Sequence, residues 1–433
     1  MRKIRREKSG IMLGAVVLVM AMLILLGGRT ALADSLFSAT IYAPAFPGQT
    51  YTINFNEAEE LDNQITTETI QTHIPGFTDN HEARATINFR GLPINLRFGA
   101  NGSTLYMSIP SIGVTETFAA GSRGASIDML EDWFKKDGGE ALSRMQQELI
   151  KVSPADPIAG NPTSLQSNMV TSAYDRGFTS TTTQIAPTPA ADQKSMQNSN
   201  MIGLGARFGS LRASGLDGSY YSFPLAYSFR WTEDPRQMLT ISVPISVVEV
   251  EEAKSYSIGL GLALTWPINK QWAITPAFQY GFVGSVDLGS VSQMVSGSLT
   301  SAYTWDLKDG YKLSMGNMIG YYKTLEFEYQ GYKFDPDIQN TIFRNGLMVS
   351  IPAEKIYPNT VVEVFIIDTR FFGSDLYLDS YEEIGFAFGF NKFSSKELPE
   401  KIVNTIRSFR VGLSYLWGDG DNNVATLNFG FAF

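Results

Sequence analysis

The sequence predicts an all-β fold: a 12-stranded antiparallel transmembrane β-barrel, preceded by a small N-terminal α+β module and a signal peptide. Three observations predict it. Residues 201–433 alternate between apolar and small or polar residues in runs of about ten, the length of a tilted strand that crosses a bilayer. Aromatic residues gather at the ends of these runs, where lipid-interface girdles lie. Beyond the first 33 residues, no apolar run is long enough for a spanning helix.

Residues 1–33 are expected to be a signal peptide. Five basic residues among the first eight precede an apolar stretch from Ile11 to Leu26, and Ala31-Leu32-Ala33 is a small-x-small cleavage site. A retained membrane anchor is the alternative, but the apolar stretch is short for a span of about 20 residues. We therefore expect cleavage after Ala33 and an exported chain.

Composition narrows the function. The chain has 34 Lys and Arg against 43 Asp and Glu, a formal net charge of −9, so no nucleic-acid partner is expected. Cysteine is absent, which excludes disulfides and thiolate metal sites. The two histidines, His73 and His81, lack ligand spacing and are expected at the surface. Because residues 201–433 contain no His to activate a nucleophile, we expect neither an enzyme nor a cofactor, although carboxylate-only catalysis stays open.

Residues 34–152 are expected to form a small antiparallel β unit followed by helices. Alternating runs occupy residues 50–55, 85–90, 94–98, 104–109 and 114–118. A helix is expected to begin after Ser126 as N-cap and to break at Gly138-Gly139, and a second carries Leu142, Met145 and Leu149 on its apolar side. Amphipathic stripes usually face a core, so we expect both helices to pack on the β unit. A helix seated in the barrel lumen is the alternative.

Residues 153–200 are polar and poor in periodicity. They include three prolines before residue 163 and the hydroxyl-rich run 179–183. Such a composition is not expected to form a core. The segment is predicted to be a polar linker or a segment that threads a barrel lumen.

Twelve alternating runs follow in residues 201–433. Their apolar faces begin at Ile202, Tyr221, Leu239, Tyr256, Trp272, Leu299, Tyr311, Phe343, Val362, Ile384, Phe409 and Ala425. A soluble sandwich would need a second sheet of equal apolarity, which periodicity alone does not exclude. Ser301 and Asn317 fit the barrel poorly, because both polar residues fall on the lipid side. Three prolines, Pro224, Pro244 and Pro276, also lie inside predicted strands, and a β-bulge at some of them would reconcile the pattern.

Connection length predicts the topology. Residues 232–236, 267–270 and 306–310 are tight turns, whereas residues 323–340 and 373–383 are long links. An even number of strands puts both ends of the barrel chain on the periplasmic side, where turns are short. We therefore expect the tight turns in the periplasm and the long links outside. Residues 393–403 form a longer link that this scheme places in the periplasm.

Seven charged residues are expected to point into the lumen: Arg207, Arg230, Lys312, Arg344, Glu363, Glu383 and Arg410. One interpretation is a weakly anion-attracting pore. The other, slightly preferred, is an ion-pair network that braces the barrel wall. The run Asp419 to Asn423 resembles the start of a calcium loop but lacks the downstream Glu, so a solvated hairpin is expected.

The last stretch, Asn422 to Phe433, puts apolar residues on one face and ends on an aromatic residue. Four of them, Leu427, Phe429, Phe431 and Phe433, form a pattern that resembles the C-terminal assembly signal of bacterial outer-membrane β-barrels. The resemblance implies location in the outer membrane of a Gram-negative cell. It also implies outer-membrane lipid, lipopolysaccharide, the barrel-assembly machinery and periplasmic chaperones as partners.

A 12-stranded barrel behind an exported region and a polar connector resembles an autotransporter, a passenger followed by its translocator. The resemblance covers residues 201–433 and rests on strand count, architecture and the terminal Phe. Two features depart from the family: the N-terminal region is short and lacks solenoid repeats, and residues 190–199 form only a mediocre helix. The implied function is anchoring or export of a short N-terminal region. A small-solute channel with a periplasmic or plug N-terminal module is the alternative, and an adhesive surface protein is a third option.

Overall fold

A computed structural model describes residues 35–178, 201–234, 236–329, 331–356, 360–390 and 409–431. The predicted signal peptide, the link at residues 393–403 and Phe433 lie outside these ranges. No helix among the described residues is long and apolar enough to cross a bilayer.

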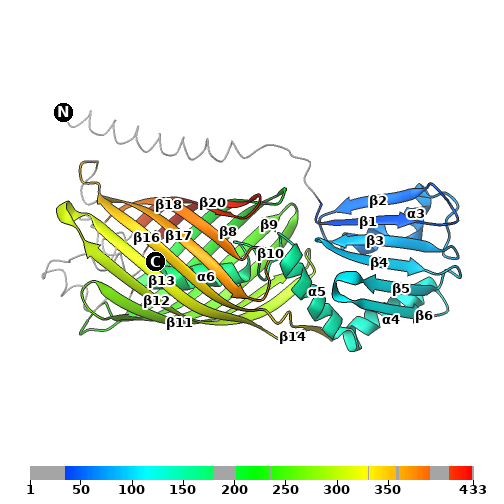
Figure 1. Ribbon diagram of the computed structural model, residues 1–433, viewed down its shortest axis with the longest axis horizontal. Coiled ribbons are helices and arrows are strands. Elements are labelled where there is room, and N and C mark those ends of the chain that lie inside the picture. The colour runs from blue at the N-terminus through cyan, green and yellow to red at the C-terminus, as the bar shows by residue number, and fades with distance from the viewer. Residues whose placement is uncertain are drawn as a thin grey trace. The chain divides into compact units, whose positions relative to one another are not determined.

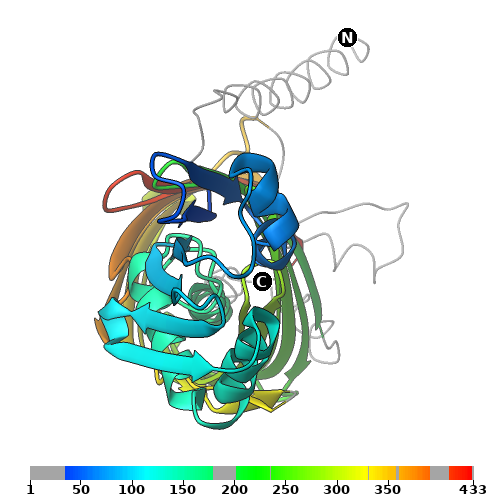
Figure 2. The same ribbon diagram turned by 90° about the vertical axis from the view of Figure 1, so that its right-hand side faces the viewer.

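Twelve antiparallel strands form a closed barrel (Figure 1). They are β7 (Met201–Ala213), β8 (Leu216–Arg230), β9 (Met238–Val250), β10 (Ala253–Pro267), β11 (Trp272–Ser285), β12 (Ser290–Asp306), β13 (Lys312–Leu325), β16 (Gln339–Pro352), β17 (Thr360–Gly373), β18 (Ser380–Phe390), β19 (Phe409–Gly418) and β20 (Asn422–Phe431). Each strand pairs with the one before it, and β20 closes the ring on β7. Figure 2 shows the ring from one end, its strands passing from green through yellow to orange and red. The predicted 12-stranded barrel is confirmed.

The apolar face of the wall points outward. On β10, Tyr256, Ile258 and Leu260 are 57%, 49% and 52% exposed, whereas Ser255 and Ala263, which point to the other side of the strand, are 6% and 2% exposed. The other strands repeat this alternation. A soluble protein does not leave so large an apolar surface in water, so hydrocarbon covers this belt.

Strand prolines are accommodated without a bulge. Pro224 pairs with Pro244 across β8 and β9, and both lie where bridges to their other neighbours are skipped. The register is the same on both sides of each gap, and the same holds for Pro276 between β10 and β11. The predicted β-bulges are therefore wrong, because skipping a bridge removes the need for the missing donor without inserting a residue.

The two polar residues on the lipid side both have partners. Asn317 Nδ2 donates to Asn345 Oδ1 (2.8 Å) on the neighbouring strand, and Trp272 Nε1 donates to Ser301 Oγ (2.9 Å). A polar group in hydrocarbon is costly unless it is hydrogen-bonded. Pairing lets both residues lie on an otherwise apolar face.

The two ends of the barrel carry connections of different lengths. We call the end where β7 begins and β20 ends the terminal end, and the opposite end the module end. The shortest connections, Ser214-Gly215, Glu251-Glu252 and Asp419–Asp421, lie at the module end, together with the long link between β13 and β16. The tight turns predicted at residues 232–236, 267–270 and 306–310 lie at the terminal end, and the long links predicted at residues 323–340 and 373–383 lie at the module end, as expected. The prediction did not include the still shorter turns at the module end. Ser214 and Glu251 adopt positive φ (49° and 54°), which allows these turns to be two residues long.

The N-terminal module is a six-stranded antiparallel sheet of order β2-β1-β3-β4-β5-β6. Its strands are β1 (Phe37–Tyr42), β2 (Thr50–Phe55), β3 (Ala83–Phe89), β4 (Leu92–Phe98), β5 (Thr104–Ile109) and β6 (Val114–Ala119), and its helices are α2 (Glu60–Gln64), α3 (Thr67–His73), α4 (Arg123–Lys136) and α5 (Gly139–Val152), with a 3-10 turn at Pro110–Ile112. The sequence missed the inner strand β1. The two histidines lie on this module, His73 exposed and stacked on Tyr51 (ring centroids 4.0 Å apart) and His81 partly buried.

Helices α4 and α5 pack on the sheet. Met145 and Leu149 of α5 share a core with Leu105 and Phe118 of the sheet. Ser122, and not Ser126, is the N-cap of α4: it accepts from Ala125 N (3.2 Å). Ser126 is buried instead, and its hydroxyl donates to Ser103 O (2.6 Å). The breaker at Gly138-Gly139 separates the two helices, since α4 ends at Lys136 and α5 begins at Gly139.

The module contacts the barrel at the module end. Ala58 N donates to Asp287 O (2.8 Å) in the turn between β11 and β12. An apolar cluster joins the two parts: Phe37, Phe55 and Ile87 of the sheet lie with Leu216 and Val250 of the barrel. The module is thus seated on the barrel rim through buried surface.

Candidate functional site: the plugged lumen

A helix occupies the lumen. It is α6 (Leu165–Gly177), capped by Ser164, whose side chain accepts from Ser167 N (3.4 Å). The preceding loop enters at the module end, where Gly160 O accepts from Leu378 N (3.0 Å). Thirteen residues of helix extend about 20 Å. We call α6 the lumenal helix.

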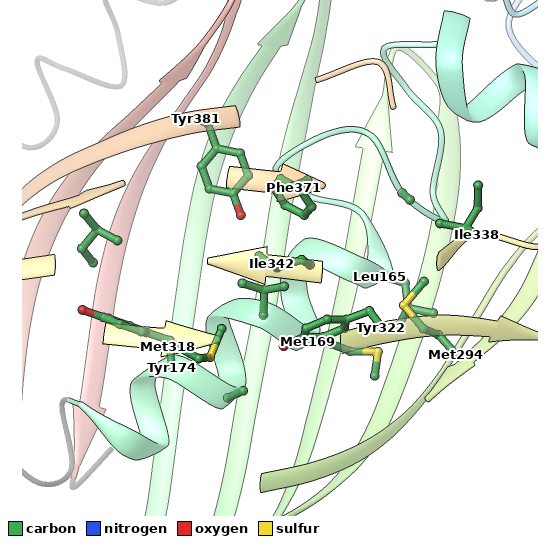
Figure 3. Packing of buried hydrophobic residues seen from close by; sticks show 14 of the residues in the cluster. Leu165, Met169, Tyr174, Met294, Met318, Tyr322, Ile338, Ile342, Phe371 and Tyr381 are labelled. Carbon is green, nitrogen blue, oxygen red and sulfur yellow. The ribbon is translucent and has the colours of Figure 1, made fainter. Parts of the chain in front are cut away.

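The lumenal helix packs against one wall. Leu165, Met169 and Tyr174 face barrel side chains on β12, β13 and β16 (Figure 3). The wall residues of this cluster include Met294, Met318, Tyr322 and Ile342. All of these side chains are less than 3% exposed, so the helix and wall form a protein core inside the barrel.

Glycines in the wall make room for the helix. A Cβ at Gly281 would lie 2.7 Å from Met169 Sδ, and one at Gly316 would lie 2.6 Å from Tyr174 Oη. A Cβ at Gly346, on the next strand, would lie still closer to the same tyrosine hydroxyl. Small residues on the inner face of a barrel are common in polar lumens. At these positions their role is instead to admit a packed helix.

Polar groups of the lumenal helix are matched to the wall. Asn168 Nδ2 donates to Ser246 Oγ (3.1 Å), and Asn168 Oδ1 accepts from Tyr220 Oη (2.6 Å). Gln166 Nε2 donates to Asn340 Oδ1 (3.1 Å), and Arg176 Nη1 donates to Ser242 Oγ. Because buried polar groups demand specific partners, these bonds fix the rotation and depth of the helix.

Six of the seven predicted lumenal charges are in ion pairs among the described residues. Arg344 pairs with Glu383 (2.8 Å) and lies over the Tyr174 ring (5.2 Å to its centroid). Arg410 pairs with Glu363 (3.0 Å), and Lys312 with Asp306 (3.5 Å). For Arg230 the described residues give no ion pair.

The sixth charged residue, Arg207, pairs with Asp175 of the lumenal helix. This contact crosses from the wall to the plug, so the charges do more than brace the wall: one of them holds the helix. Asp175 lies in a segment read as a linker, and sequence reasoning missed it.

Cavities lie beside the helix among the described residues. One of about 170 Å³ lies toward β16–β20 and β7 and is lined by Asp175, Arg207, Arg344, Glu363 and Arg410 among others. The second, about 70 Å³, lies toward β7–β10. Volumes of this size hold groups of water molecules and are too small for a wide channel. No group of three or more His, Asp or Glu able to hold a metal ion occurs in the described part of the chain.

The prediction that residues 153–200 form no core is wrong up to Phe178. Leu165, Met169, Val170, Ala173 and Tyr174 recur with the spacing of one helix face. That signal was present, but prolines on one side and hydroxyl-rich sequence on the other obscured it. The lumen-threading alternative describes the segment better, although it is α6, and not the helix after Ser126, that enters the lumen.

A buried ion pair joins module, loop and barrel. Arg90, in the turn between β3 and β4, donates to Asp156 Oδ2 (3.1 Å) in the lumenal loop and to Ser290 Oγ (2.9 Å) at the start of β12. Both charged side chains are at most 1% exposed. Burial raises the pKa of Asp156 and lowers that of Arg90, since each loses hydration, while their mutual attraction opposes both shifts. We call this contact the junction pair.

The predicted assembly signal lies on β20, the closing strand. Leu427 is paired with Leu413 and Phe208, and the Phe429 ring lies 6.1 Å from that of Phe208 across the seam. Phe431 ends the strand, and Phe433 is outside the described residues. The run Asp419 to Asn423 forms the turn into β20, with Asn422 Nδ2 donating to Asp419 O (2.6 Å).

Comparison with protein-family models gives no match, and comparison with curated protein sequences gives none either. Solved structures that match include the β domain of the Bordetella autotransporter BrkA, at 13% identity over 54% of this chain and 99% of that one (TM-score 0.37). The translocator domain of NalP from Neisseria meningitidis matches at 11% identity over 54% and 88% of the two chains (TM-score 0.34). The NanC porin matches at 11% over 53% and 100% (TM-score 0.33).

The geometry of the wall defines the class of protein. Its twelve strands close on themselves, which satisfies the backbone without water, and its outer face is apolar. The chain is therefore an outer-membrane β-barrel, the class to which autotransporter translocators and porins belong.

Proposed function

We propose that this barrel anchors the N-terminal sheet at the cell surface and that the lumenal helix is the connector left in the barrel after export, as in an autotransporter. One observation carries the proposal: the module sits at one end of the barrel, β7 begins at the other, and α6 lies between them inside the wall. The described chain therefore enters at the module end and lies inside the lumen as far as Phe178.

Orientation follows from the ends of the barrel chain. In outer-membrane barrels with an even number of strands, the first and last strands meet the periplasm. The terminal end is then periplasmic, and the module end faces outward.

A second candidate is a small-solute channel with a periplasmic module and a removable plug. The shortest turns lie at the module end, and short turns are typical of the periplasmic side. The charged cavity of about 170 Å³ would be its narrow path. Against it, the helix is held by packing, hydrogen bonds and an ion pair, so the lumen is filled.

Single cysteines can test the orientation because the natural chain has none. Thr115→Cys places an exposed thiol on β6 of the module, and Lys270→Cys places one in a turn at the terminal end. With a membrane-impermeant maleimide on intact cells, we expect labelling of the Thr115→Cys variant only. Permeabilised cells should label both variants, which controls for reactivity. The reverse pattern on intact cells would overturn surface display and favour the channel.

Conductance gives an independent test of the plug. In planar bilayers, the intact protein should stay closed, whereas removal of residues 158–178 should give steady openings. A large steady conductance from the intact protein would contradict the plug.

A further inference from the structure

The hairpin between β13 and β16 carries four aromatic side chains on one face. Its strands are β14 (Phe327–Tyr329) and β15 (Tyr332–Phe334), and the cross-strand pairs are Phe327 with Phe334 and Tyr329 with Tyr332. Alternation along each strand puts all four rings on one side and the Glu328–Lys333 pair on the other. Tyr329 is 58% exposed.

This aromatic face continues the lipid-facing belt. The Phe327 ring lies 5.5 Å from that of Phe282, whose side chain is on the outer side of β11. Gln293 Nε2, from the outer side of β12, donates to Glu326 O (2.6 Å), which holds the start of the hairpin against the wall. On the same outer side of β11, Phe278 is 56% exposed.

The depth of the contact is that of a membrane interface. Trp272 begins β11 at the terminal end, and Phe282 follows ten residues later. At about 3.3 Å per residue and a tilt of about 40°, these residues are separated by about 25 Å along the barrel axis, the height of the apolar band. Nearby, Tyr280 Oη donates to Gln293 Oε1 (2.7 Å) and Tyr321 Oη to Gln339 Oε1 (2.8 Å). Aromatic bodies with polar tips are typical of this level.

The opposite face of the hairpin is held by the module. On this side, a Cβ at Gly139 would lie 3.5 Å from Lys333 Cβ. Lys135 of α4 reaches the aromatic side instead, where its Nζ lies 5.4 Å from the centre of the Tyr332 ring. Asp335 N donates to Ser143 Oγ (3.2 Å). The hairpin is thus fixed between the barrel wall and the helices α4 and α5, which sets the direction of its aromatic face.

We propose that the aromatic face of the β14–β15 hairpin is a lipid-binding surface. This surface contacts the upper part of the acyl chains and the headgroup boundary in the leaflet at the module end. A bilayer lipid, and not a soluble partner, is the occupant because the face is continuous with the belt that lipid already covers. The surface would hold the module at a fixed height on the membrane. This inference does not depend on which leaflet lies at the module end.

The test uses the full chain with single cysteines at Tyr329→Cys and at its neighbour Glu328→Cys, which faces the other side. Each is labelled with an environment-sensitive dye, and the protein is reconstituted in phosphatidylcholine vesicles containing phosphatidylcholine spin-labelled near the top of its acyl chains. We expect several-fold stronger lipid quenching of the dye in the Tyr329→Cys variant. Iodide, which quenches from water, should show the opposite order.

Leu260→Cys, on the belt and 52% exposed, sets the full lipid signal, and Thr115→Cys on the module sets the water signal. Equal lipid quenching at the two hairpin sites would overturn the proposal. So would a dye at Tyr329→Cys that is shielded from iodide without lipid quenching, since a protein surface would then cover the face.

Discussion

The barrel and the N-terminal sheet are both antiparallel sheets built from alternating strands. The apolar face is buried under protein in the sheet and exposed on the outside of the barrel. In the sheet, Leu105 and Met107 are 1% and 2% exposed and pack under helices, whereas Leu260 and Leu262 of the barrel are 52% and 44% exposed. Inside the barrel, the face that should be polar contains an apolar core around α6. Alternation shows that two faces differ. What covers each face is decided by closure of the sheet and by what the chain inserts.

Loss of one partner at the contact between the two regions should have the largest effect. Arg90→Ala leaves Asp156 buried without a counter-charge, and removal of one partner of a buried pair costs about 3–5 kcal/mol. We expect the module to become protease-sensitive while the barrel keeps its heat-modifiable gel mobility.

The double substitution Arg90→Met with Asp156→Leu should recover most of the loss, because no buried charge remains. If the single and double variants are equally sensitive to protease, the packing of the Arg90 side chain, and not its charge, stabilises the contact.

Leucine truncation should separate a protein-covered face from a lipid-covered one. Leu105→Ala leaves a cavity in the sheet core and should cost about 2–5 kcal/mol. Leu262→Ala should cost less than half as much, since lipid chains fill the space that the leucine vacates. Urea unfolding followed by site-specific dyes in each region measures both. Similar losses would mean that protein covers the belt.

Wall glycines give a comparison of the inner and outer faces. Gly281 contacts Met169 of the plug, while Gly297 on the adjacent strand has open space on the lipid side. Gly281→Leu should displace the lumenal helix and raise conductance at least several-fold over the closed state. Gly297→Leu should leave conductance unchanged, and a rise in both variants would point to a general loosening of the wall.

The polar pair on the lipid face should show the smallest effect. Asn317→Leu leaves Asn345 without its partner and should cost about 0.6–2 kcal/mol, the range of such bonds in membranes. Replacing both residues with Leu should restore stability in a refolding titration. A double variant less stable than either single one would assign the pair a role other than mutual satisfaction.

Much of the wall could be predicted from the sequence, because a strand with lipid on one face and the lumen on the other has an apolar residue at every second position. Three things could not be. The position of the lumenal helix inside the barrel could not be predicted, although its apolar spacing was present, because polar residues such as Asn168 and Asp175 contact wall groups that only the closed ring brings near. Strand β1 was missed because it precedes the alternating runs that were recognised. Bulges were expected at prolines because a sequence does not show that two of them, Pro224 and Pro244, face each other.

The route of the chain through its own ring constrains the order of assembly. A folded six-stranded sheet does not fit through a barrel whose described interior is packed around a single helix. The segment before β7 must therefore pass while unfolded, or the seam between β20 and β7 must shut around it. In either case, the chain passes through the closed barrel and carries a folded module at the module end. A force that draws the lumenal helix toward the module end would stretch the chain that joins the helix to β7 before the helix could leave the barrel.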